Sequence, residues 1–207
     1  MHVALFSGTF DPVHNGHLAA ARAALADQRF QLDRILFVPT DAPPHKQQFP
    51  LTPYEQRFAM LVAALEEAKE PGFIASRMEA PDGASAGTPR YSIQTVRKFK
   101  QTLAAGDELY FMLGIDSFQD IAKWREPEAL LEECRFIVVS RPGYSMGNAL
   151  AALPHIPAAA NVFLLEDVEA DISSTAIREA VGHGDRLEKL VPKSVARYIE
   201  KHRLYRG

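Results

Sequence analysis

The chain has few cysteines, no long apolar runs and little net charge, and each shortage excludes a class of protein. Its one cysteine, Cys134, cannot form an internal disulfide, and its apolar neighbours predict a core thiol rather than a nucleophile. No apolar run approaches the length of a membrane span, and the N-terminus lacks the pattern of a signal peptide. We therefore expect a cytoplasmic protein with no membrane partner. A net charge of -3 also argues against a nucleic-acid partner.

The pattern of apolar residues predicts one α/β domain over residues 1–207. Short apolar runs alternate with amphipathic helical stretches, which indicates a Rossmann-like, mostly parallel sheet with helices on both faces. No repeat or composition break marks a second domain. A C-terminal helical part (about 172–207) is expected to pack on the rest of this single domain. Helices are expected from about 16 to 28, after a Thr52-Pro53-Tyr54-Glu55 capping box, after a Ser92 cap and from near Pro192. Strands are expected at 3–6, 35–38, 73–78, 109–113, 136–139 and 162–165.

The segment 7–17, Ser-Gly-Thr-Phe-Asp-Pro-Val-His-Asn-Gly-His, carries the strongest functional signal. It leaves a predicted buried strand, turns at Gly8 and enters a helix near Gly16. A glycine lets backbone approach a ligand closely, and the unpaired amides of a helix N-terminus bind anions. His14 and His17 are three residues apart, so both can face one point and stabilise charge on a transferring phosphoryl group. Either histidine alone favours a structural turn, whereas the whole segment favours a triphosphate site.

A second segment, Ile-Ser-Ser-Thr-Ala-Ile-Arg at 172–178, also predicts phosphate contacts. Ser173 is suited to cap a helix, and the hydroxyls of Ser174 and Thr175 would lie in its first turn. Arg178 follows about one turn later on the same face and can reach a phosphate. Alone, the segment is typical of a capped surface helix. Combined with the first segment, it favours a site for the triphosphate of a nucleotide.

The first segment resembles the nucleotide-binding signature of the nicotinate/nicotinamide mononucleotide adenylyltransferases, which belong to a wider nucleotidyltransferase group with an H-x-G-H motif. The second resembles the other phosphate-binding motif of that family, and the chain departs from the pattern only slightly, by Ser7 where a second glycine is usual. The resemblance implies that His17, with His14, contacts the α- and β-phosphates of ATP and that Arg178 contacts the leaving pyrophosphate. The implied ATP-binding residues are Gly8, Thr9, Phe10, His14, Gly16, His17, Gly114, Asp116, Ile172, Ser173, Ser174, Thr175 and Arg178.

The middle of the chain contains residues that bear on the identity of the acceptor, the molecule that would receive the adenylyl group. Its Pro43-Pro44-His45-Lys46 loop is similar to a P-P-H-[KR] loop of nicotinate mononucleotide adenylyltransferases. The resemblance implies that Trp124 stacks on the pyridine ring and that backbone amides of Arg125 and of Ser92 or its neighbour receive the nicotinate carboxylate. An acid acceptor should then be preferred over an amide. The chain departs from the family by Ser92 in place of threonine and by a longer loop at 80–90. The implied acceptor-binding residues are Lys46, Ser92, Thr95, Trp124, Arg125 and Arg141.

No carboxylate or Cys/His cluster has the spacing of a metal site, so we expect Mg²⁺ to arrive with ATP. Asp11 is typical of a turn former, although it could touch the hydration shell of the ion, and Asp116 is the better candidate for ribose hydroxyls. The predicted reaction joins the adenylyl group of ATP to nicotinate mononucleotide, giving deamido-NAD and pyrophosphate in NAD biosynthesis.

Two alternatives remain open at this point. The same fold could act on nicotinamide mononucleotide or phosphopantetheine, although the chain length and the Pro-Pro-His-Lys loop argue against the latter. The chain could instead be a nucleotide-sensing module without turnover, although the retained His14, His17 and Arg178 argue against that. The sequence also leaves open whether the protein forms a homo-oligomer.

Overall fold

A parallel sheet forms the centre of the molecule. The computed structural model describes residues 1–42, 51–81, 89–140, 161–166, 168 and 172–206. Its six-stranded sheet has the order β3-β2-β1-β4-β5-β6, and every neighbouring pair is parallel, as the sequence predicts. The predicted strand over 73–78 is shorter than expected and ends at Ala75. The strands are β1 (His2–Gly8), β2 (Arg34–Pro39), β3 (Phe73–Ala75), β4 (Glu108–Gly114), β5 (Arg135–Val139) and β6 (Val162–Leu165).

The order of the strands locates a binding crevice. From β1 the chain moves outward to β2 and β3, then returns to the other side of β1 as β4 and moves outward again. The connections that leave β1 and β4 therefore run in opposite directions, which opens a crevice at the carboxyl ends of these two strands. Gly8 and Gly114 are the last residues of β1 and β4, so both lie at this crevice.

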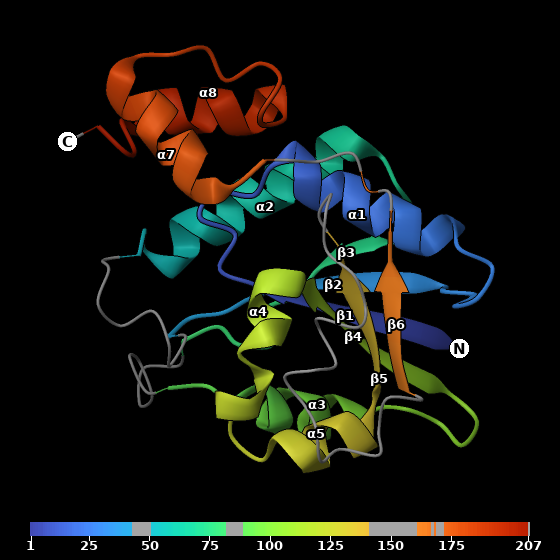
Figure 1. Cartoon of the computed structure of the whole chain (residues 1–207). Helices are drawn as coiled ribbons and strands as arrows, with labels where there is room; N and C mark the ends of the chain where they lie inside the picture. Colours follow the sequence, from blue (N-terminus) through green and yellow to red (C-terminus); the bar gives the residue numbers. More distant parts are fainter. Residues whose placement is uncertain (43–50, 82–88, 141–160, 167, 169–171, 207) are drawn as a thin grey trace.

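Helices cover both faces of the sheet (Figure 1). On one side lie α1 (Asn15–Ala26), α2 (Tyr54–Ala68), α7 (Ser174–His183) and α8 (Lys193–His202). On the other side lie α3 (Ser92–Lys100) and α5 (Pro127–Glu133), while α4 (Ile115–Gln119) and the 3-10 turn η1 (Ile121–Lys123) follow β4 directly. Within the described ranges, no helix combines the length and the apolar character needed to cross a bilayer.

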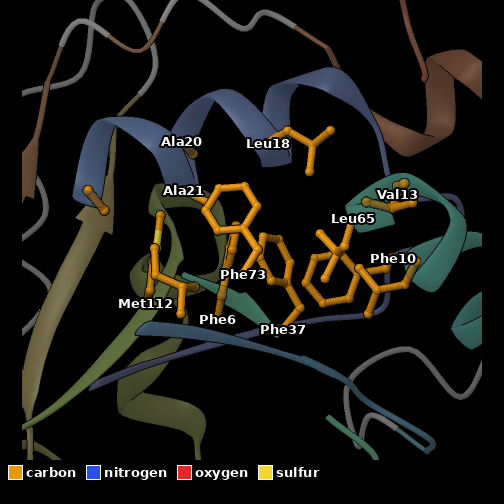
Figure 2. Close-up of a cluster of buried hydrophobic side chains, with 14 of the residues drawn as sticks. Phe6, Phe10, Val13, Leu18, Ala20, Ala21, Phe37, Leu65, Phe73 and Met112 are labelled. Carbon is orange, nitrogen blue, oxygen red and sulfur yellow. The ribbon is translucent and has the colours of Figure 1, made fainter. Parts of the chain in front are cut away.

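Aromatic side chains fill the core between the sheet and α1 (Figure 2). The Phe6 ring lies 5.4 Å from that of Phe37, which in turn lies 5.1 Å from that of Phe73. The small side chain of Ala21 lets α1 approach this layer closely. On the other face of the sheet Cys134 is buried, and burial raises the pKa of its thiol to about 12, which confirms the predicted core thiol.

Two helix starts differ from the sequence prediction. Pro53 occupies the cap position of α2, and Thr52 makes no capping box. The peptide N–H of Thr52 instead donates to the carboxylate of Asp11, 3.1 Å away. The residue that was expected to cap the helix therefore bonds to a loop that is distant in sequence. Ser92 is likewise not a cap: Tyr91 holds that position, and Ser92 begins the first turn of α3.

The C-terminal helices are tied to α2. The peptide N–H groups of Lys193 and Ser194, at the start of α8, donate to the two carboxylate oxygens of Glu67 at 3.1 and 2.7 Å. These bonds lower the pKa of Glu67, and they satisfy amides that a helix start leaves without intrahelical partners. The end of the chain is therefore held against the face of the sheet that α1 and α2 cover.

Candidate active site

Two histidines meet at the start of α1, beside the crevice. The His14 and His17 rings stack with their centroids 3.6 Å apart, and the His14 peptide N–H donates to Nδ1 of His17 at 3.2 Å. A neutral His17 ring that accepts at Nδ1 carries its proton on Nε2. Phe6 and Phe10 pack edge-on against His17, with centroids 5.8 and 4.9 Å away. Packing and a hydrogen bond therefore fix the orientation of a ring that can donate from Nε2.

Phe10 supports this loop from the core side. Its φ of 46° lies in the left-handed region, which is uncommon for a residue other than glycine and which persists where the surroundings hold it. Its ring is buried against Phe6 and Phe37, and a Cβ added at Gly8 would touch the same ring at 3.4 Å. The buried side chain of Phe10 thus packs beneath the backbone between β1 and α1 and supports it.

The second segment contacts the first directly. Ser173 caps α7 with its side chain, as predicted. The Ser174 hydroxyl donates to the carbonyl oxygen of Pro12 at 3.0 Å, and Nη1 of Arg178 donates to the carbonyl oxygen of Asp11 at 2.8 Å. The first turns of α7 therefore hold the backbone of a loop that lies more than 160 residues earlier in the chain.

One cavity of about 700 Å³ brings His14, His17 and Arg178 together, and we call it the phosphate cradle. Its volume lies in the range of ordinary ligand pockets. Phe10 does not line it, and its predicted part in ATP binding stays a prediction. The cradle is also lined by residues that sequence reasoning missed, such as Ser117 and Ser140. The predicted ATP-binding residues that line it are Gly8, Thr9, His14, Gly16, His17, Gly114, Asp116, Ile172, Ser173, Ser174, Thr175 and Arg178.

A smaller cavity of about 130 Å³, the acceptor pocket, adjoins the phosphate cradle. Both are lined by Ser7, Gly8, Thr9 and Ser117, so they meet over the end of β1. Of the predicted acceptor-binding residues, Ser92, Trp124 and Arg125 line the pocket. Lys46 and Arg141 lie outside the described residues.

Aromatic rings shape the acceptor pocket. Trp124 is half-buried and meets Phe111 edge-on, with the ring centroids 6.3 Å apart. The guanidinium of Arg125 lies over the ring of Tyr91, 4.8 Å from its centroid, a distance at which a cation is attracted to an aromatic face. The pocket therefore offers a flat aromatic side and a cation at its edge.

Thr95 and Glu79 form a buried pair in the wall of the acceptor pocket. Thr95, predicted to bind the acceptor, does not line the pocket, and its hydroxyl donates to Oε1 of Glu79 at 2.6 Å. Glu79 is 3% exposed, and burial raises the pKa of its carboxyl to about 7, against the opposing effects of the Thr95 hydrogen bond and the Arg90 charge. Sequence reasoning missed Glu79 because a glutamate between Met78 and Ala80 looks like an ordinary surface residue.

Arg57 joins the loops that follow β1 and β2. This arginine on α2 is 1% exposed, and its guanidinium donates to the carbonyl oxygens of Thr9 at 2.6 Å, Thr40 at 2.8 Å and Thr52 at 2.8 Å. Burial lowers its pKa, but the guanidinium stays charged because its starting value is so high. The sequence held a signal that was overlooked: Arg57 falls one turn before Leu61, on the apolar side of α2.

Asp11 accepts hydrogen bonds that brace the loop between β1 and α1. It is 2% exposed, and its two carboxylate oxygens accept hydrogen bonds from the Tyr205 hydroxyl at 2.7 Å and the Thr52 peptide N–H at 3.1 Å. In the described part of the chain, no three His, Cys, Asp or Glu side chains come together as a metal centre requires. Asp116 lines the phosphate cradle and is exposed.

Comparisons with known proteins identify the family of this chain. The sequence model of the cytidylyltransferase-like family matches residues 5–180, and the chain belongs to that family. It is 42% identical to a probable nicotinate-nucleotide adenylyltransferase of Solibacter usitatus, over 99% of this chain and 100% of that protein. It is 40% identical to a protein of the same description from Thermus thermophilus, over the full length of both. The resemblance seen in the sequence is thus confirmed.

A solved structure extends the likeness to the fold. The nicotinic acid mononucleotide adenylyltransferase of Plasmodium falciparum, complexed with NaAD, superposes with a TM-score of 0.74 at 19% identity, over 98% of this chain and 96% of that one. At this identity the likeness concerns the fold, and it confirms the predicted Rossmann-like architecture.

Proposed function

We propose that this protein is a nucleotidyltransferase that transfers the adenylyl group of ATP to nicotinate mononucleotide, forming deamido-NAD and pyrophosphate in NAD biosynthesis. One observation carries the proposal: the phosphate cradle and the acceptor pocket meet over Ser7, Gly8 and Thr9. A triphosphate in the first and a mononucleotide in the second would bring their phosphates together at this junction. The full-length similarity to probable nicotinate-nucleotide adenylyltransferases supports the choice of acceptor.

The reaction needs positioning and charge stabilisation more than acid–base chemistry. An oxygen of the acceptor phosphate attacks the α-phosphorus of ATP, and the bond from this phosphorus to the α–β bridging oxygen breaks. The electron pair leaves with pyrophosphate. Because a phosphate is already ionised at neutral pH, no general base is required. Holding the two reactants together removes on the order of 7–11 kcal/mol of barrier.

The phosphate cradle supplies the charge stabilisation. We assign His17 and His14 to the α- and β-phosphates and Arg178 to the departing pyrophosphate. The Nε2 proton of a neutral His17 suits this role, because the donor is already in place before charge develops. Arg178 lines the same cavity and is anchored by the Asp11 carbonyl, so little reorganisation is needed as the pyrophosphate leaves.

The acceptor pocket suits a negatively charged aromatic ring. We assign Trp124 to stack on the pyridine ring, and the amides of Ser92 and Arg125 to receive the carboxylate. Ser92 is the first residue of α3, so its amide lies at the positive end of the helix. Lys46 and Arg141 are proposed to hold the phosphate of the acceptor, and Thr95 to act through Glu79.

We write the nucleotide substrate as MgATP, with the ion held by phosphates and water. Both carboxylate oxygens of Asp11 already accept hydrogen bonds from the protein, which supports assigning the ion to the phosphates of ATP rather than to Asp11. Asp116 in the phosphate cradle is assigned to the ribose hydroxyls.

The test is an acceptor panel with the full chain. Pyrophosphate release is measured with MgATP and, in turn, nicotinate mononucleotide, nicotinamide mononucleotide and phosphopantetheine. We expect sustained catalytic turnover with the nicotinate compound and a lower kcat/KM for the amide. Faster release with phosphopantetheine would contradict the proposed acceptor. Binding of MgATP without release in any arm would support the nucleotide-sensing alternative instead.

A further inference from the structure

The last residues of the chain reach back to the phosphate-binding loop. After α8, Arg203 and Tyr205 have φ values of 53° and 61°, which are uncommon for residues other than glycine. This path brings the tail to the loop between β1 and α1, where the Tyr205 hydroxyl donates to Oδ1 of Asp11 at 2.7 Å, 194 residues away in sequence. A side chain at the end of the chain thus contacts the centre of the first motif.

Asp11 links the Tyr205 contact to the rest of the phosphate cradle. Its Oδ2 accepts from the Thr52 peptide N–H, and its carbonyl oxygen accepts from Arg178 at 2.8 Å. A single buried residue therefore connects the tail, the start of α2 and the arginine of the second motif. Burial and the nearby Asp11 carboxylate raise the pKa of Tyr205, which keeps its hydroxyl protonated and able to donate.

We propose that Tyr205 is a positioning residue for the nucleotide. Its hydrogen bond to Asp11 holds the loop between β1 and α1 so that His17 and Arg178 contact the same triphosphate. The inference rests on the proposed function, because it assumes that the phosphate cradle binds ATP. Ser7, Gly8 and Thr9 line both cavities, but the residues assigned to the acceptor ring and its carboxylate come from other elements: Ser92 begins α3 and Trp124 follows η1. Loss of the bond should therefore weaken the handling of ATP and leave the acceptor largely unaffected.

The test compares Tyr205→Phe with Tyr198→Phe in the full chain. The first variant removes only the hydroxyl that contacts Asp11, and the second removes a phenolic hydroxyl from α8, where Tyr198 stacks on His202. KM is measured separately for MgATP and nicotinate mononucleotide, MgATP binding is measured by calorimetry without acceptor, and Tm is recorded. For Tyr205→Phe we expect KM and Kd for MgATP to rise about five- to tenfold, less than the full loss of a hydrogen bond to a charged group, because Tyr205 acts on the nucleotide through Asp11. KM for the acceptor should stay within about twofold of wild type, and Tyr198→Phe should match wild type.

A merely structural role gives a different result. Unchanged KM values, with kcat lowered only in proportion to the folded fraction, would overturn the proposal, and so would an equal rise of both KM values. A double-mutant cycle with Asp11→Ala, which removes the acceptor, adds a second readout: if the two residues act through one bond, Tyr205→Phe should have a smaller effect in a chain that already carries Asp11→Ala. Full additivity would count against the bond as the cause.

Failure of the proposed function would be recognised separately. Wild-type protein that binds MgATP but releases no pyrophosphate with any acceptor would remove the reaction. The calorimetric comparison of Tyr205→Phe with wild type would still decide whether the tail positions the nucleotide site.

Discussion

The phosphate cradle and the acceptor pocket lie side by side, but they are built in different ways. In the cradle, hydrogen bonds from Ser174 and Arg178 fix the backbone of a loop more than 160 residues away, and two aromatic rings hold His17. In the acceptor pocket, ring contacts such as those of Trp124 and Tyr91 shape the space. On the proposed function, the triphosphate would meet a set of preset donors, whereas the acceptor ring would be selected by shape and by aromatic surfaces.

The two regions also differ in how charge is placed. The phosphate cradle gathers His14, His17 and Arg178, which in the proposed mechanism complement negative charge as it develops. The wall of the acceptor pocket contains a buried carboxyl, Glu79, with a pKa raised to about 7. A mutation in the cradle should therefore affect turnover, while changes in the pocket should affect acceptor binding or the response to pH.

Replacement of His17 by alanine should have the largest effect. The variant loses a donor that is oriented before reaction, and removal of one such donor typically lowers kcat by about 100-fold or more, or roughly 3–4 kcal/mol. KM for nicotinate mononucleotide should change little, because His17 does not line the acceptor pocket. Steady-state pyrophosphate release, with each substrate varied in turn, measures both quantities.

The matched control for this prediction is His183→Ala, which removes an exposed histidine from the last turn of α7. It should retain wild-type turnover, and circular dichroism should show that both variants are folded. Wild-type turnover in His17→Ala would rule out the assigned mechanism and remove the functional contrast between the two regions.

Replacement of Glu79 by glutamine should change the pH dependence of stability. The carboxyl has a pKa near 7 when folded and an ordinary value of 4.5, so the folded protein binds the proton more tightly than the unfolded chain does. Its contribution to stability is therefore complete below pH 4.5 and is lost as the pH rises through about 7. The free energy of unfolding of wild type, relative to Glu79→Gln, should fall by at most about 3 kcal/mol over this window.

Urea unfolding at several pH values between 5 and 8 measures this difference, in steps of roughly 1 kcal/mol per pH unit or less. Glutamine keeps an acceptor for the Thr95 hydroxyl, so the comparison isolates the charge. Glu66→Gln, at an exposed site on α2, serves as the control and should follow the wild-type profile. Parallel pH profiles for wild type and Glu79→Gln would show that Glu79 ionises normally and that the wall of the pocket is better solvated than its burial indicates.

How far the sequence predicted the site also differs between the two regions. The residues of the phosphate cradle fall in two continuous segments, so turn and helix-start chemistry identified most of them, including Ser173 as a cap. Arg57, Glu79 and Tyr205 escaped notice because their partners are carbonyl and hydroxyl groups far away in the sequence, or in the case of Tyr205 a distant carboxylate. The place of Arg57 on the apolar side of α2 predicts its burial, but no local pattern identifies the distant partner of any of the three residues.

The errors at the helix starts have the same origin. Thr52 satisfies the local pattern of a capping box, but its peptide N–H donates to Asp11 and its carbonyl accepts from Arg57. Tertiary hydrogen bonds therefore outweighed a local preference worth on the order of 1 kcal/mol. The strands were easier to predict, because burial on both faces leaves a nearly continuous apolar run in the sequence.

Replacement of Trp124 by alanine should have the smallest effect of the three and should be confined to the acceptor. Loss of one stacking surface for an aromatic ring costs about 1–3 kcal/mol, so KM for nicotinate mononucleotide should rise roughly tenfold or somewhat more. KM for MgATP should stay near wild type, because Trp124 lines the acceptor pocket and not the phosphate cradle. Trp124→Phe, which keeps an aromatic face, should recover most of the loss.

The pair of variants separates stacking from packing. Trp124 also contacts Phe111 edge-on, so its removal leaves space beside β4 and should lower Tm in Trp124→Ala. If packing alone mattered, both KM values would stay constant while Tm fell. A rise in KM for MgATP equal to that for the acceptor would show that the two cavities respond as one unit, and the contrast between preset donors and an aromatic pocket would fail.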